Sequence, residues 1–278
     1  MDAITKTAQL QLTRHAPEYW RVTINNPPLN VMGRPMVQEF ERLIEEIESD
    51  PVLKVVVFDS TVEGFFLNHS DFTAPLESLT SLPPGRSGLP PWPDFLVRLP
   101  RAPVVSIALV RGRATGNGSE LILACDMTFA SREKAIISQW EVGVGMVAGG
   151  GPMARLPALI GRNRALQVLL SSDDFRADQA EAFGYINHSL PDAELEAYVD
   201  RLAKRIAGFD KWAIGETKRL VNTGLAPDVE LGAGWDSCIN SIGRASTQRS
   251  IKALIAEGFH APGEVEDHLG QYIGDLNP

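Results

Sequence analysis

The chain has few cysteines, no long apolar run and no excess of positive charge. Only two cysteines occur among the 278 residues, Cys125 and Cys238, and neither belongs to a CxxC motif. We therefore expect two reduced core thiols rather than a disulfide. No stretch approaches the ~20 apolar residues that span a membrane. The formal charge of −9 argues against a nucleic-acid or anionic-membrane partner, because both need clustered Lys and Arg.

Metal-binding and export patterns are also missing. The five histidines form no HExxH motif and no close cluster, so no metal site is predicted. The first fifteen residues lack the basic-then-apolar pattern of a signal peptide, and the expected location is cytoplasmic. The hydrophobic fraction of 44% is ordinary for a globular protein, and 278 residues fit one large domain or one domain with an appendage.

Short strands and one helix alternate in the first half of the chain. Apolar residues at helical spacing predict an amphipathic helix from Met36 to Ile47. The predicted strands cover residues 10–15, 19–25, 54–60, 103–110, 126–131 and 134–138. A strand, a helix and a strand in succession predict a layered α/β unit.

Helices are predicted for most of the second half. Their expected ranges are residues 153–160, 162–170, 177–183, 193–207, 212–222 and 229–257. Apolar helix faces that find no sheet must pack on each other or on another subunit. We therefore expect residues 1–195 to form the core with the active site, and residues 196–278 to form a helical region used for homo-oligomerisation.

The segment from Ser81 to Phe95 holds five prolines. Proline removes a backbone donor and restricts the chain, so this segment is predicted to be neither a regular helix nor an inner strand. A long irregular loop of this kind is often a lid or a pocket rim, and we expect it to cover part of a binding pocket. A plain surface excursion is the alternative.

The stretch RGRATGNGSELILACD, residues 111–126, follows a predicted strand and leads into an apolar helix expected from about Ser119. Free amides at such a helix start can stabilise an anion. Gly116 and Gly118 allow a ligand to approach the backbone closely, and Asn117 between them tolerates left-handed geometry. Taken locally, the stretch is equally compatible with an ordinary turn in which Glu120 only complements the helix dipole.

Several motifs in chain order settle which family the sequence resembles. They are NNPPLNVMG (25–33), GFFLNHSDF (64–72), the strand-to-helix stretch 102–131, SQWEVGVGMVAGGGPMARLPALIGRNRAL (138–166) and FRADQAEAFGYINHSLPDAEL (175–195). Together they resemble the enoyl-CoA hydratase/isomerase (crotonase) superfamily over about residues 8–222. The resemblance implies an α/β fold, a crotonase-like spiral of repeated ββα units with a C-terminal helical region. It also implies a homotrimer or a dimer of trimers.

The resemblance assigns roles to four residues. The backbone N–H groups of Ser70 and Asn117 would form the oxyanion hole that holds the thioester oxygen. Glu120 and Glu141 would divide acid–base work on a water molecule. Retention of both glutamates favours addition of water across the conjugated double bond of an acyl thioester, or the reverse reaction, within fatty acid metabolism. Coenzyme A would be part of the substrate, and no separate cofactor is expected.

Other positions depart from the family pattern or adjoin the expected pocket. His69 replaces a glycine, and it is either an acid–base or hydrogen-bonding group in the pocket or a structural histidine at a strand end. Trp140 replaces a proline. The further candidate pocket residues are Asn68, Gly116 and Gly149.

The basic residues that would contact CoA phosphates are not evident. No lysine follows Asp71, and the chain ends without the family's aromatic-then-lysine pattern. The remaining candidates for phosphate contacts are Arg14, Arg34, Arg111 and Lys252.

Four alternatives stay open beside hydration. They are hydrolysis of a C–C bond in a β-diketone, a CoA-independent hydratase using His69, a double-bond isomerase, and a non-catalytic oligomeric paralogue. A dinucleotide site at GVGMVA (143–148) is disfavoured, because three further glycines and Pro152 delay the helix that such a motif should open. The sequence leaves open the acyl group and the choice between trimer and hexamer.

Overall fold

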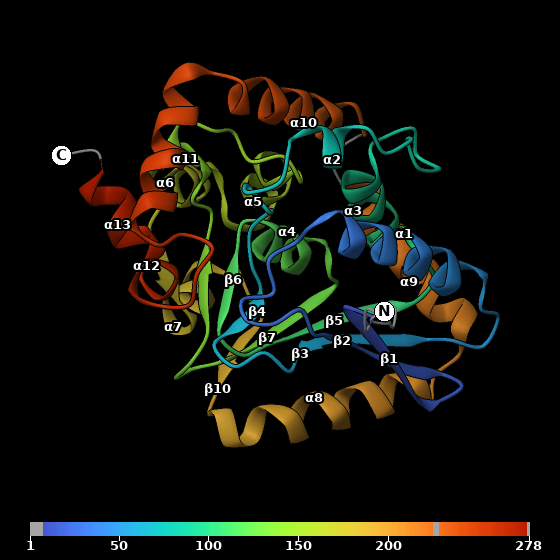
Figure 1. Cartoon of the computed structure of the whole chain (residues 1–278). Coiled ribbons are helices and arrows are strands. Elements are labelled where there is room, and N and C mark those ends of the chain that lie inside the picture. The colour runs from blue at the N-terminus through green and yellow to red at the C-terminus, as the bar shows by residue number, and fades with distance from the viewer. Residues whose placement is uncertain (1–7, 225–227, 277–278) are drawn as a thin grey trace, which may run out of the picture.

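The computed structural model describes residues 8–224 and 228–276 (Figure 1). Its main sheet has the order β1-β2-β3-β5-β7-β10. The strands are β1 (Leu10–Ala16), β2 (Tyr19–Ile24), β3 (Val55–Ser60), β5 (Val105–Val110), β7 (Met127–Ser131) and β10 (His188–Leu190). The pair β1–β2 is antiparallel, and all other neighbours are parallel. The central strands are covered on both faces, which explains why they are continuous apolar runs rather than alternating ones.

A second sheet has the order β4-β6-β8-β9 and crosses the first in Figure 1. Its strands are β4 (Phe65–Leu67), β6 (Arg113–Thr115), β8 (Ile136–Ser138) and β9 (Asp174–Arg176). Each of β3, β5 and β7 is followed along the chain by a strand of this second sheet and then by a helix. This repetition confirms the predicted α/β spiral of ββα units.

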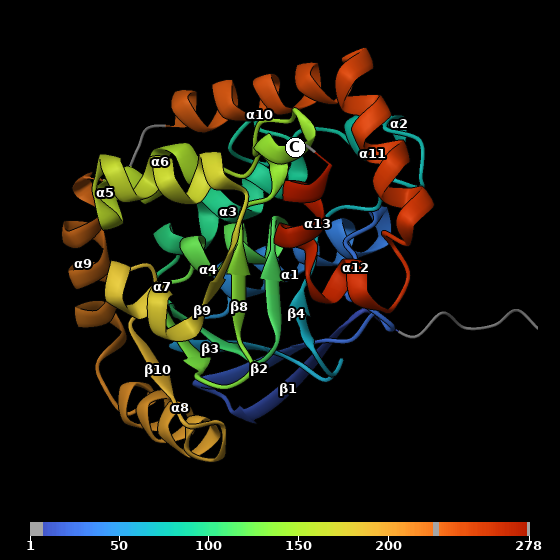
Figure 2. The same ribbon diagram turned by 90° about the vertical axis from the view of Figure 1, so that its left-hand side faces the viewer.

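The helices fill the layers around the sheets and the C-terminal third. They are α1 (Arg34–Ser49), α2 (Glu77–Thr80), α3 (Pro91–Arg101), α4 (Asn117–Ala124), α5 (Pro152–Ile160), α6 (Arg162–Ser171), α7 (Ala177–Phe183), α8 (Asp192–Ala207), α9 (Lys211–Val221), α10 (Asp228–Ile242), α11 (Ala245–Glu257), α12 (Glu264–Asp267) and α13 (Leu269–Asp275). Helix α8 packs on one face of the main sheet, and α10 and α11 lie at the opposite end of the molecule (Figure 1, Figure 2). No helix in the described ranges is long and apolar enough to cross a membrane.

Two predictions of local structure are wrong. Residues 91–95, predicted to be irregular, form the first turn of α3. Proline is tolerated there because the first N–H groups of a helix have no intrahelical acceptor. The single helix predicted over residues 229–257 is two helices, α10 and α11, since Gly243 lies outside both and Arg244 has extended backbone.

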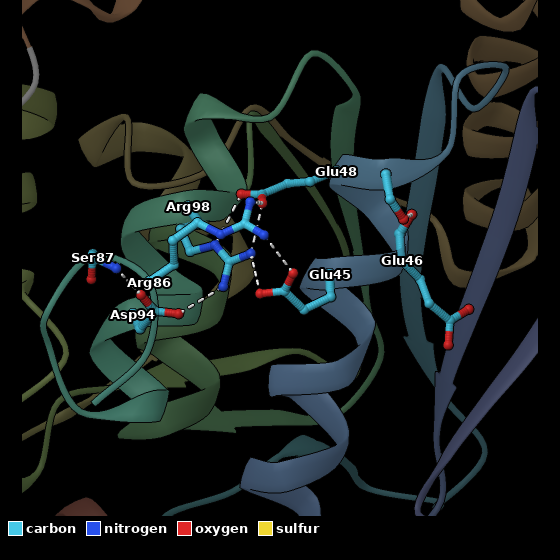
Figure 3. Close-up of polar contacts among 8 residues, drawn as sticks. Glu45, Glu46, Glu48, Arg86, Ser87, Asp94 and Arg98 are labelled. Carbon is cyan, nitrogen blue, oxygen red and sulfur yellow. Dashed lines mark hydrogen bonds and ion pairs between the residues drawn. The ribbon is translucent and has the colours of Figure 1, made fainter. Parts of the chain in front are cut away.

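An ion network around the buried guanidinium of Arg98 fixes helix α3 against α1. The guanidinium of Arg98 is 2.7 Å from Glu45, 2.6 Å from Glu48 and 3.0 Å from Asp94. Arg86, from the proline-rich loop, contacts the same two glutamates at 2.9 and 3.0 Å (Figure 3). The loop and the start of α3 are therefore tied to α1, which places the beginning of α3 beside α4.

Candidate active site

Glycines allow helix α4 to begin close to its neighbours. Gly116 has φ of +55°, and a Cβ there would lie 2.9 Å from Nε1 of Trp140. A Cβ on Gly118 would lie 1.9 Å from the carbonyl oxygen of Leu67, at the end of β4. Only glycine fits at this second position, because the helix start and the end of β4 are in direct backbone contact. Glu120 is thereby placed in the first turn of α4, beside the residues that follow β4.

Residues predicted from separate motifs line one cavity of about 280 Å³: Ser70, Asn117, Glu120, Glu141, Trp140 and Gly149. The remaining wall comes from residues 71, 72 and 74–76, from Met146, and from α10 and α11, which contribute apolar side chains such as Trp235 and Ile251. The region predicted for oligomerisation thus also contributes to the cavity. Oligomerisation itself stays a prediction.

Glu120 is buried and held by three N–H donors. Its Oε2 accepts hydrogen bonds from Nε1 of Trp92 at 2.7 Å and from Nδ2 of Asn117 at 3.2 Å. Its Oε1 accepts a hydrogen bond from the backbone N–H of Gly150. Burial raises the pKa of Glu120, while these donors and the nearby Arg155 oppose the rise. The carboxyl group is therefore fixed in one orientation toward the cavity.

Glu141 lies at the start of a 3₁₀ turn, Glu141–Val144, that follows β8. Its side chain is buried, and its Oε2 has no hydrogen-bond partner among the described residues. Burial and the charge of Glu120 raise its pKa to about 8. An unpaired buried carboxyl oxygen facing a cavity is costly unless a ligand or water completes it. This oxygen is free to contact a bound molecule.

Ser70 and Asn117, whose backbone N–H groups are the predicted oxyanion donors, both line the same cavity. Met32 forms a parallel β-bridge to Ser70. Its N–H donates to the carbonyl oxygen of His69, and its carbonyl oxygen accepts from the N–H of Asp71. The intervening N–H of Ser70 makes no hydrogen bond within the described residues, and neither does the N–H of Asn117 at the start of α4. The Ser70 hydroxyl donates to Oδ1 of Asn117 at 2.8 Å. The side-chain amide of Asn117 therefore links the Ser70 hydroxyl to the carboxylate of Glu120.

Three candidate pocket residues do not line the cavity. His69 and Asn68 are buried and bond to the carboxylate of Glu266 instead. Of the two roles left open for His69, the contacts resemble the structural one, because its ring nitrogens face Glu266 and the carbonyl oxygen of Ser70. The third, Gly116, lies behind the side chains of Trp140 and Glu141, which are the nearest groups that a Cβ at this position would meet.

Of the groups around Glu120, sequence reasoning missed Trp92, Gly150 and Arg155. Trp92 lies in the proline-rich segment, where nothing in the sequence marks an indole as a donor. A Cβ on Gly150 would lie 2.3 Å from Cδ of Glu120, so glycine is required there, and the GGG run was the available signal. The guanidinium of Arg155 donates to the carbonyl oxygens of Gly150 at 2.9 Å and of Leu96 at 2.6 Å. It links the glycine loop to α3.

The expected rim and phosphate contacts are only partly near the site. Residues 90–92 line a smaller pocket of about 20 Å³ that also touches Ser70 and Asn117, whereas the preceding loop lines neither of these two pockets. Arg14 pairs with Glu46, and Arg111 pairs with Asp192 and Glu196. Arg34 donates to the carbonyl oxygen of Ser78, and the Lys252 side chain is exposed. None of these four basic residues lines the cavity.

The chain is similar to known proteins along most of its length. The sequence profile of the enoyl-CoA hydratase/isomerase family matches residues 19–254. The chain is 29% identical over 218 residues to the short-chain-enoyl-CoA hydratase of Clostridium acetobutylicum, which covers 78% of this chain and 82% of that protein. It is 29% identical over 209 residues to the crotonyl-CoA hydratase of Syntrophomonas wolfei, covering 74% and 79% of the two chains.

A solved structure is similar over nearly the whole length. It belongs to a Streptomyces avermitilis protein provisionally assigned as an enoyl-CoA hydratase. The TM-score is 0.91 and the sequence identity 36%, with 97% of this chain and 98% of that chain covered.

Proposed function

This chain belongs to the enoyl-CoA hydratase/isomerase family, and from that premise we propose that it adds water across the conjugated double bond of an acyl thioester, or eliminates it. Membership supports hydratase-like, hydro-lyase activity in general. The observation that carries the specific reaction is the meeting of two buried carboxyl groups, Glu120 and Glu141, on one cavity.

The two glutamates differ in the way that such a reaction needs. Glu120 has three N–H donors, which oppose the rise that burial causes in its pKa and fix its position. Glu141 has a free oxygen and a pKa raised to about 8, so it is mainly protonated at neutral pH. We assign Glu120 as the base that takes a proton from water and Glu141 as the acid that delivers a proton to the α-carbon.

The atoms balance over the addition. The water oxygen bonds to the β-carbon as one water proton moves to Glu120. The electrons of the double bond shift toward the thioester oxygen and give an enolate. The proton of Glu141 then bonds to the α-carbon. A proton exchange through water then restores both carboxyl groups. In the proposal the enolate oxygen is held by the backbone N–H groups of Ser70 and Asn117, and each donor of this kind is worth about 3 kcal/mol.

Coenzyme A enters this proposal as part of the substrate, and no separate cofactor or metal is required. A homotrimer or dimer of trimers, a cytoplasmic location and a role in fatty acid metabolism are further parts of the proposal, drawn from the family resemblance. The hydrolase and CoA-independent alternatives that relied on His69 lose support, because that ring does not line the cavity.

The test compares Glu120→Gln and Glu141→Gln with wild type on a panel of enoyl-CoA esters, CoA-free enones and β-diketones. Loss of the conjugated thioester chromophore and formation of the 3-hydroxyacyl product measure turnover. Each variant should lose about 10²-fold or more, given the usual scale of acid–base catalysis. The exposed Glu63→Gln is the matched control, since it makes the same chemical change far from the cavity lining.

Full activity in either cavity variant would refute the two-carboxylate mechanism. Reaction of the CoA-free compounds alone would refute the thioester substrate.

A further inference from the structure

A buried ion pair joins the C-terminal segment to the residues that carry the first oxyanion amide. Nε2 of His69 is 3.0 Å from Oε1 of Glu266, and the two side chains are 1% and 0% exposed. The residues are 197 positions apart in sequence. His69 directly precedes Ser70, so the pair acts on the backbone beside the cavity.

The carboxylate of Glu266 gathers two further donors. Nδ2 of Asn68 donates to Oε2 at 2.8 Å, and the backbone N–H of His260 donates to Oε1 at 2.8 Å. The imidazole of His260 in turn accepts a hydrogen bond from the backbone N–H of Phe72 at 3.2 Å. Residues 68, 69 and 72 are thus all bonded to the same short C-terminal stretch.

The imidazole of His69 contacts both Glu266 and the backbone of Ser70. Its Nδ1 lies 3.0 Å from the carbonyl oxygen of Ser70, while its Nε2 faces the Glu266 carboxylate. Burial alone would raise the pKa of Glu266, but the charge of His69 and the surrounding donors lower it to about 2.

Aromatic packing keeps water away from the pair. The His69 ring centroid lies 4.1 Å from that of Phe259 and 5.6 Å from that of Trp140. A dry surrounding strengthens electrostatic contacts between paired groups and makes the loss of one partner costly. The cluster is therefore a rigid support rather than a set of interchangeable surface contacts.

We propose that His260 and Glu266 form a clamp that positions the Ser70 N–H toward the cavity by holding residues 68–72 in place. His69, His260 and Glu266 are then positioning residues, because none of the three lines the cavity. The clamp rests on the proposed function, in which the Ser70 amide holds the developing enolate oxygen. An oxyanion donor acts only when its N–H points at the developing charge. A small displacement of the Ser70 N–H therefore reduces stabilisation of the transition state more than it reduces binding of the substrate.

The first test is Glu266→Gln, assayed by steady-state kinetics on a short enoyl-CoA. The turnover number should fall about 10-fold while KM stays within about 2-fold, because the lost alignment matters mainly in the transition state. Binding of an enolate-mimicking thioester should weaken by about the same 10-fold. His260→Asn is the second variant, since asparagine tolerates the φ of +71° and removes the ring that accepts the bond from Phe72. It should lower turnover in the same direction.

The matched control is Asp174→Asn, which loosens the C-terminal segment at a different anchor. Asp174 pairs with Arg113, which also donates to the carbonyl oxygen of Asp267. This control should lose stability but keep turnover within about 2-fold. Equal losses of turnover in the control and in Glu266→Gln would reduce the clamp to a general stability effect and overturn it.

A substrate-free measurement separates the clamp from the proposed function. Amide hydrogen exchange of peptides covering residues 68–72 should become faster in Glu266→Gln and stay unchanged in Asp174→Asn. Unchanged exchange in both variants would overturn the clamp. If the wild type neither binds nor turns over enoyl-CoA, the proposed function fails, and exchange alone decides whether the C-terminal segment holds this strand end.

Discussion

Replacing Glu141 by glutamine should stabilise the protein at neutral pH while removing its activity. The side chain is 6% exposed, and burial together with the charge of Glu120 raises its pKa from 4.5 to about 8. Between these two values the unfolded chain has lost a proton that the folded protein retains. Folding stability therefore falls as pH rises through this window. Glutamine has no such proton and avoids the loss.

The expected size follows from the width of the window. Each pH unit over which the two states differ by one proton is worth about 1.4 kcal/mol. From pH 4.5 to pH 7 the wild type should therefore lose about 3 kcal/mol that Glu141→Gln keeps. The free energy of unfolding, measured with urea at pH 5, 7 and 8.5 at one protein concentration, should show a gap that widens with pH.

Glu266 supplies a control of opposite sign. Its pKa is lowered from 4.5 to about 2, so it contributes stability that is present above pH 4.5 and lost as pH falls toward 2. Glu266→Gln should therefore be less stable than wild type at pH 7. A Glu141→Gln protein no more stable than wild type at pH 7, or a gap independent of pH, would refute the argument that the folded protein keeps Glu141 protonated.

Three further predictions concern the groups that hold Glu120. Trp92→Phe removes an indole donor to the carboxylate of Glu120, and a hydrogen bond to a charged group is worth about 1.5–3 kcal/mol. Turnover should therefore fall about 10-fold or more. Trp20→Phe is the control, because its buried Nε1 has no partner among the described atoms. Gly150→Ala places a Cβ 2.3 Å from Cδ of Glu120 and should leave less than about one hundredth of the turnover, with an unchanged circular dichroism spectrum. Arg155→Met removes a positive charge that lowers the pKa of Glu120, so the acidic limb of the kcat/KM profile should move to higher pH; an unmoved limb would contradict this contribution.

The strand-to-helix stretch could be predicted because its chemistry is local. The glycines at 116 and 118 mark a turn with close backbone contacts, and the apolar run after Ser119 marks a helix. The helix begins two residues earlier, at Asn117, which is within the ordinary uncertainty of helix ends. The candidate roles of Glu120 and Glu141 came from motif order, and the cavity brings both residues together.

The proline-rich segment could be predicted only in part. Proline content correctly marked an irregular loop up to residue 90, but the start of α3 depends on packing against α1 through Arg98. No local pattern indicates that Trp92 ends 2.7 Å from Glu120, because that distance is set by the docking of two helices. The same holds for His69, whose partner lies 197 positions away.

The sequence by itself determined the α/β class, five of the six strands of the main sheet and, through the family resemblance, which residues could supply amides and carboxyl groups. The class and the strands follow from periodicity and turn chemistry, which act over a few residues at a time, whereas the candidate site residues follow from the resemblance to a known family. Tertiary structure alone decided the environment of each group. It gave Glu120 three donors, left one oxygen of Glu141 unpaired, and turned His69 toward Glu266 instead of the cavity. Burial and hydrogen-bond partners fix the protonation state and the orientation of each side chain. Both depend on contacts between segments that are distant in the chain.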